Sequence, residues 1–239
     1  MMAHTVKKGW VVFAATVAMV FCTMLISGSW RNHQQYAANS EIVNESFDVY
    51  GVRVVEINVE SGLNIEFSDA AVGRATLKTE RGSEGSTYTG RINNGVLQIN
   101  GSGYAFDNVL TLPSSVKEIR IATTKDGQPD LRVHSVDGMS VPELTIKANQ
   151  PANLSLTNMN IKYLLINLPY TTEENAAQQL ALHNTKIGDF EVSMNFGDLV
   201  RSGDTRFEKA QFKLGDSVNL SGWSARLVQK MVISSFKSP

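Results

Sequence analysis

The sequence of 239 residues predicts an all-β domain, folded as a right-handed β-solenoid and preceded by one N-terminal transmembrane helix. Three observations predict this architecture. An uncharged apolar run lies near the N-terminus, apolar and polar residues alternate from Val52 onward, and similar strand pairs recur roughly every 20 residues in the second half. Asn, Gly and Ser make up 58 of the 239 residues, a composition typical of a turn-rich β protein.

The first segment, residues 1–29, is predicted as a short cytoplasmic end followed by a membrane anchor. Trp10–Ile26 is a run of 17 residues without a charge, and Lys7 and Lys8 precede it. With the next two residues the run spans about 28 Å as a helix, close to the roughly 30 Å of a hydrocarbon core. The preceding lysines place the N-terminus in the cytoplasm and the rest of the chain outside. The alternative is a cleaved signal peptide with its cleavage site at Ser27-Gly28-Ser29.

Residues 30–49 are polar and aperiodic, and we predict that they form a juxtamembrane linker before an all-β domain at residues 50–239. Period-two alternation in that domain predicts half-buried strands, most clearly at residues 55–59. Asn93-Asn94-Gly95 is a strong hairpin-turn sequence between two of these strands. The other strands predicted in this half span residues 63–67, 75–79, 87–92, 96–99, 109–112 and 116–122.

Five similar units in the second half predict stacked coils. Each unit has an apolar residue at its third place and a small residue or Asn at its fifth, and the third-place residues recur after 23, 26, 18 and 20 positions. Asn158 and Asn184 occupy equivalent places, which favours the solenoid. An antiparallel sandwich with even strand spacing is the alternative. The units begin at Leu131, Leu154, Leu180, Asp198 and Val218.

Three segments of this pattern resemble the putative auto-transporter adhesin head domain, also called the GIN domain. They are the alternating run at residues 55–65, the strand at residues 94–99, and the Leu112-Pro113 step that leads to Ile119. The resemblance covers residues 50–235. It implies a bacterial, envelope-attached β-solenoid with no established catalytic site, so no catalytic residue is transferred to this sequence.

Few residues offer catalytic or metal chemistry. Cys22 is the only thiol and lies in the apolar run, and no Gly-x-Ser-x-Gly nucleophile motif occurs. His134 and His183 are predicted on one outer face two coils apart, about 10 Å at the β-strand spacing, which is too far for a shared metal ion. We therefore assign no catalytic residue, no cofactor and no metal site.

The sequence predicts a non-catalytic, membrane-anchored envelope protein that acts as a structural or interaction module, like an adhesin head. The net charge is -1, with 22 basic and 23 acidic residues, which gives no support for a nucleic-acid partner. The expected partners are the membrane, through the N-terminal helix, and another envelope protein or a glycan. The expected location is the inner membrane, crossed once, with the C-terminal domain in the periplasm or outside the cell.

Two sets of residues follow from these functions. The alternation leaves three external aromatic residues on predicted turns unexplained, and these form the candidate binding surface, because aromatic anchors dominate many interfaces: Tyr104, Tyr170 and Trp223. The alternative function is a carbohydrate-active β-helix enzyme, a polysaccharide lyase or hydrolase. Its candidate charges, predicted to cluster across neighbouring coils, are Asp189, Arg201, Asp204, Arg206 and Glu208.

Overall fold

A computed structural model describes residues 41–60, 62–81, 87–102, 108–122, 129–168, 178–224 and 232–235. The transmembrane helix predicted within residues 1–29 lies outside these residues, as does most of the predicted linker. Within the described part of the chain, no helix is long and apolar enough to span a membrane. By its contacts the chain divides into two units, Met1–Glu41 and Ile42–Pro239, and the fold described below is that of the second unit.

The described chain is all-β, as predicted, and its strands form one continuous sheet of 16 strands. Two 3₁₀-helices are the only helical elements among the described residues: η1 (Asp69–Ala71) and η2 (Val136–Gly138). The strands are β1 (Glu41–Asp48), β2 (Val54–Val59), β3 (Leu63–Phe67), β4 (Arg74–Arg81), β5 (Thr87–Asn93), β6 (Val96–Ser102), β7 (Val109–Leu112), β8 (Glu118–Ile121), β9 (Asp130–Ser135), β10 (Ser140–Ala148), β11 (Asn153–Thr157), β12 (Asn160–Asn167), β13 (Gln179–His183), β14 (Lys186–Ser202), β15 (Arg206–Ser221) and β16 (Val232–Ser235).

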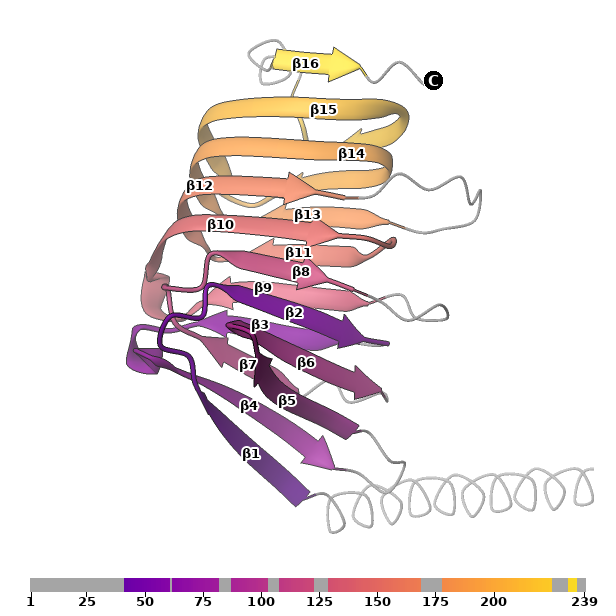
Figure 1. Ribbon diagram of the computed structural model, residues 1–239. Coiled ribbons are helices and arrows are strands. Elements are labelled where there is room, and N and C mark those ends of the chain that lie inside the picture. Colours follow the sequence, from indigo (N-terminus) through magenta and orange to yellow (C-terminus); the bar gives the residue numbers. More distant parts are fainter. Residues whose placement is uncertain are drawn as a thin grey trace, which may run out of the picture. The chain divides into compact units, whose positions relative to one another are not determined.

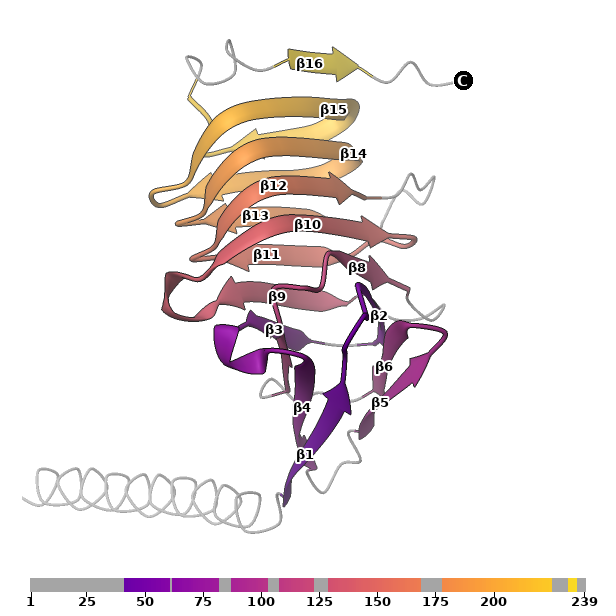
Figure 2. The same cartoon turned by 60° about the vertical axis from the view of Figure 1, so that its left-hand side comes forward.

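The sheet bends back on itself as two stacked layers and is nearly closed (Figures 1 and 2). The first layer runs in the order β5-β6-β2-β8-β10-β12-β14-β15-β16, and the second in the order β1-β4-β7-β3-β9-β11-β13-β14-β15. β14 and β15 appear in both because each starts in the first layer, bends, and continues in the second. Each coil thus gives one strand to each layer, and successive coils pair in parallel.

The core lies between the two layers and is built from the side chains that point inward along each strand. Leu156 and Leu182 are both fully buried and lie directly opposite each other in the paired strands β11 and β13, as the repeat predicted. The largest fully buried side chains are Phe67, Phe190 and Phe212. The alternation seen in the sequence therefore reports which side chains face the core.

The predicted register is confirmed for the first three coils and is wrong for the last two. Leu131, Leu154 and Leu180 are in register, but the next members of this column are Leu199 and Leu220. The units predicted to begin at Asp198 and Val218 are therefore displaced by one and two residues. Arg201, and not Val200, takes the inner place beside Leu182. The reason is that the guanidinium satisfies main-chain carbonyl groups at this corner, where an apolar side chain would leave them without a donor.

The early coils are connected in an order that the repeat pattern did not predict. The coil formed by β2 and β3 lies between the later coils β6–β7 and β8–β9. An excursion of β4 and β5 precedes β6, and these two strands pair antiparallel with β7 and β6. The hairpin between β5 and β6 turns at Asn94 (φ 49°) and Gly95 (φ 76°), as predicted.

A further strand, β1, occupies part of the segment predicted as a linker, so the β domain begins before residue 50. The polar stretch Asn44-Glu45-Ser46 hid the alternation there. Phe47 of β1 packs on Gly90 of β5, where a Cβ atom would lie 2.2 Å from the ring. Tyr88 packs in the same way on Gly101 and donates its hydroxyl proton to the Gly62 carbonyl (3.1 Å). Glycines under aromatic rings are a known device for joining strands at sheet edges.

Candidate functional site

The corner where each coil passes from the second layer to the first is a repeated polar structure. Asn158 (φ 55°), Asn184 (φ 49°) and Gly203 (φ 59°) follow residues that are in register, so they occupy equivalent places in successive coils. The predicted equivalence of the two asparagines is thus confirmed. Their left-handed backbone conformation suits Asn and Gly, because Asn tolerates it and Gly lacks a Cβ atom. The Asn184 side chain accepts a bond from the Asp204 N–H (2.9 Å) and so links one coil to the next.

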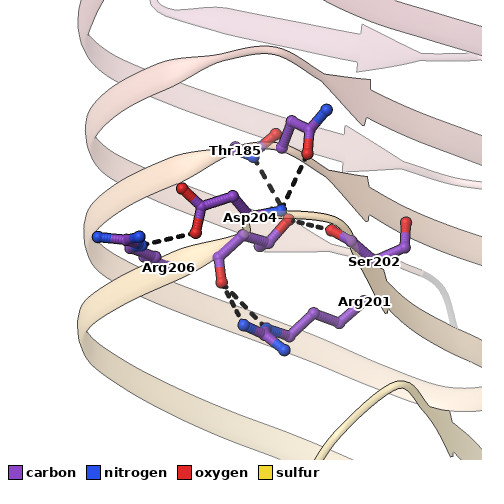
Figure 3. Close-up of polar contacts among 7 residues, drawn as sticks. Thr185, Arg201, Ser202, Asp204 and Arg206 are labelled. Atoms are coloured by element: carbon purple, nitrogen blue, oxygen red, sulfur yellow. Dashed lines mark hydrogen bonds and ion pairs between the residues drawn. The ribbon is translucent and has the colours of Figure 1, made fainter.

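Two buried threonines complete this corner (Figure 3). The Thr205 hydroxyl donates to the carbonyl of Ser202 (2.8 Å) and to that of Leu182 in the preceding coil (3.3 Å). The Thr185 hydroxyl repeats this arrangement one coil earlier, and the Thr185 N–H donates to Thr205 Oγ1 (3.3 Å). Arg201 donates through Nε and Nη2 to the Thr205 carbonyl. These polar groups are therefore used to close the coil.

The charges proposed for the alternative enzyme do not converge on one site. Asp204 pairs with Arg206 at 2.7 Å, and both are well exposed (Figure 3). Asp189 lies beside Lys209 at 3.5 Å on the outer face of the first layer. Arg201 is bound to main-chain carbonyls at the corner. An acid and a base facing a shared cleft, as glycoside hydrolysis requires, are not formed by these residues.

One Ser–His pair exists at this corner, and its hydrogen bonds run in the wrong sense for nucleophilic catalysis. His183 Nδ1 lies 2.9 Å from Ser202 Oγ, and His183 Nε2 lies 2.9 Å from Asn184 Nδ2. The Asn184 oxygen is engaged by the Asp204 N–H, so the Asn184 amide group donates to Nε2. The proton of the neutral ring is then on Nδ1 and is donated to Ser202. His183 in this state does not accept the serine proton, as a general base must.

The predicted binding aromatics have different outcomes. Tyr104 and Tyr170 lie outside the described residues. Trp223 is half-buried at the C-terminal end of the core, stacked on Phe207 (5.5 Å between ring centroids) and edge-on to Phe212 (5.4 Å). Its Nε1 donates to the Leu199 carbonyl (3.1 Å). This packing holds the ring in place, and its part in a binding surface stays a prediction.

The outer face of the first layer is charged. Glu118 accepts hydrogen bonds from Arg120 (2.8 Å) and from Lys147 of the next strand (3.2 Å). Burial would raise the pKa of the Glu118 carboxyl, but these two bonds and the two positive charges together hold it below its usual value. On the same face, burial and then the charges of the neighbouring Glu191, Glu143 and Asp189 raise the pKa of the Tyr163 phenol, which stays protonated.

The outer face of the second layer is different, because its central strands carry no charged side chain. We name it the uncharged face and define it by the outward residues of β11, β13 and the end of β14, which the register places in three columns. The sequence analysis missed this face, since outward positions form a surface only once the strand register is known. His134 and His183 lie two strands apart in its third column, as predicted, and His134 contacts Glu66 at 3.7 Å. Its residues are Asn153, Ser155, Thr157, Gln179, Ala181, His183, Val200 and Ser202.

Concave and metal-binding features are minor in the described part of the chain. A hollow of about 200 Å³ is lined by Gly62, Leu63, Asn64, Asp130 and Arg132, which is smaller than the usual small-molecule site of about 300–1,000 Å³. Among these described residues, no group of three or more His, Cys, Asp or Glu side chains is placed to hold a metal ion. Recognition at a flat outer face is thus a better fit to the geometry than recognition in a pocket.

No family model matches the chain, and no curated protein matches it in sequence. Three solved structures are similar to it. A putative adhesin from Bacteroides fragilis has 10% identity and a TM-score of 0.37, with 82% of this chain and 96% of that chain covered. A putative cell adhesion protein from Clostridium sporogenes has 7% identity and a TM-score of 0.31, covering 77% and 99%. A putative adhesin from Parabacteroides merdae has 11% identity and a TM-score of 0.31, covering 82% and 97%.

Proposed function

We propose that this chain is a non-catalytic interaction module of the bacterial envelope, similar in kind to an adhesin head. The observation that carries the proposal is how its polar groups are used. The candidate acids and bases pair on the surface or bind main-chain groups at the corner, and the His183–Ser202 pair is oriented against general-base catalysis. A rigid stack of coils with flat outer faces is instead suited to holding a partner. Right-handed winding of the coils and kinship with the GIN domain belong to this proposal.

The same proposal places the chain in the inner membrane, with the β domain on the outer side. The supporting feature is the uncharged run Trp10–Ile26, preceded by two lysines. Fractionation tests it: the intact protein should stay in the membrane pellet after carbonate washing, and a chain lacking residues 1–29 should be recovered as a soluble protein. A soluble product whose N-terminus is Trp30 would show that the segment is a cleaved signal peptide.

Complementation of a deletion strain tests the non-catalytic role. Alanine substitution of Asp189, Asp204, Arg206 or Glu208 should leave the deletion phenotype fully complemented, because a binding surface distributes its energy over many side chains. Loss of an essential acid or base would lower an enzyme's activity by orders of magnitude. Complete loss of complementation by one of these variants, with an unchanged circular dichroism spectrum, would overturn the proposal in favour of the enzyme.

A further inference from the structure

The two outer faces of the same coils differ sharply in charge. In the first layer, β10, β12, β14 and β15 present Glu143, Lys147, Asp189, Lys209 and Lys213 to solvent. In the second layer, the outward side chains of β11 and β13 are amides, hydroxyls, a methyl group and one imidazole. The contrast lies within single coils, so it does not follow from the overall composition. Unpaired strand faces normally carry charges for solubility, and the uncharged face departs from that practice.

The groups on the uncharged face are well suited to a ligand that is rich in hydroxyl groups. The amides of Asn153 and Gln179 and the hydroxyls of Ser155 and Thr157 both donate and accept hydrogen bonds. Sugar hydroxyls do the same, and contact with them removes no ion from water, which would be expensive. The side chains stand on a parallel sheet whose register is set by the core leucines, so they are held in place before a ligand arrives.

The size of the uncharged face favours a small extended ligand over a protein partner. Its three strands are about 15 Å wide at the usual strand spacing, and five residues along each strand span about 17 Å. The resulting area is on the order of 250 Å², whereas a stable protein interface needs about 800 Å² on each partner. Charged residues flank it, with Asp130 and Arg132 on β9 and Asp198 at the start of the β14 segment.

We propose that the uncharged face binds a neutral, linear glycan along the columns formed by β11, β13 and β14. This inference rests on the proposed interaction function and names the ligand class and the surface for it. A chain of a few sugar units lies flat across the three strands, and its hydroxyl groups exchange hydrogen bonds with the amide and hydroxyl side chains. Acidic glycans are disfavoured, because the central strands offer no cation to pair with them.

The test measures binding of neutral hexaoses to the full chain in detergent by isothermal titration calorimetry. The probes are cellohexaose, maltohexaose, xylohexaose and chitohexaose, with hexagalacturonate as the acidic comparison. At least one neutral hexaose should bind. Ser155→Lys places a long cation in the centre of the face and should weaken that binding at least tenfold. The matched control is Ser193→Lys, the same change on the outer face of the first layer, and it should leave binding unchanged.

Each other outcome overturns the inference. Binding of hexagalacturonate alone, binding of none of the neutral probes, or equal losses in both lysine variants would each contradict it. Ala181→Glu serves as a second variant at the same place, should Ser155→Lys fail to fold. The complementation experiment remains independent: if the alanine variants complement fully while no neutral hexaose binds, the interaction function stands and its partner is of another class, such as an envelope protein.

Discussion

At the scale of single residues, the polar interior of the corner is as decisive as the apolar core. Thr185 and Thr205 are fully buried, and each hydroxyl serves two main-chain carbonyls in two different coils. Such carbonyls have no water to turn to when their donor is removed. The hydroxyls therefore join successive coils at a point where the strand ladder is interrupted by the turn.

Thr205→Val should lower the free energy of unfolding by about 1–3 kcal/mol, because the valine leaves the carbonyls of Leu182 and Ser202 without this donor. Thr205→Ser keeps the hydroxyl and should cost less than the valine variant. Urea unfolding of the two variants, followed by circular dichroism, measures the difference. Equal losses would show that the methyl group, and not the hydroxyl, is what stabilises the corner.

Neighbouring residues on one strand should respond in opposite ways to substitution. Leu156 is fully buried above Leu182, so Leu156→Ala should cost about 2–5 kcal/mol through lost contacts and the cavity left behind. Ser155 points outward, and Ser155→Lys should change stability by less than about 0.5 kcal/mol. Thermal and urea unfolding of both variants give the comparison. Losses of similar size in the two would mean that the strand faces are reversed.

The residues that the sequence predicted well are those whose environment is set locally. Inward and outward places alternate along any half-buried strand, so Leu156, Leu182 and Ser155 could be placed from the pattern alone. Arg201 could not, because a hydrophobic pattern prefers Val200 at an inner place, and the carbonyls that Arg201 serves come from residues beyond its own strand. The uncharged face needed the register of three strands at once, which alternation does not contain.

At the scale of strands, the first layer is held from outside by a line of cross-strand polar pairs. Arg91 of β5 donates to Gln98 of β6 (3.0 Å), and Gln98 donates to Glu56 of β2 (3.2 Å). The line continues on β8 and β10, where Glu118 joins Arg120 and Lys147. Strands that are distant in sequence are paired here, so the line contributes to choosing the correct neighbours as well as to stability.

Acid should weaken the Glu118 contribution to this line. Because its pKa is lowered in the fold, the stabilisation is present above its ordinary pKa of 4.5 and is lost as the pH falls through the lower, folded value. The difference in urea midpoint between the native protein and Glu118→Gln should therefore be larger at pH 7 than at about pH 3. A difference that does not change between the two pH values would contradict the assigned role of the charge.

At the scale of the whole molecule, the coil made by β2 and β3 is the best-protected part of the sheet. It has a paired coil on each side, β6–β7 and β8–β9. By contrast, β5 pairs with a single strand, β6, within the described sheet. Alternation revealed both coils but not their order in the stack, because many parallel strands of similar length and pattern are acceptable neighbours for one another.

Native-state hydrogen exchange should report this order directly. Amides of β2 and β3 should be among the slowest to exchange, since they open only when the coils on both sides separate. Amides of β5 and of the last coil should exchange much faster. Mass spectrometry of peptic fragments resolves these regions. Protection that decreases steadily from the N-terminal to the C-terminal strands, without a maximum at β2–β3, would disagree with the described stacking.

The central position of β2–β3 also sets a delay during synthesis. These strands leave the ribosome first, yet the last strand that pairs with them, β9, ends at Ser135, 68 residues after Phe67. At roughly 5–20 residues per second, that interval lasts about 3–14 s. Until it ends, both edges of an apolar coil carry open hydrogen-bonding groups, which any other nascent copy can pair with. The order of coils thus makes chaperone protection during export matter more for this domain than for a solenoid that stacks in the order of its synthesis.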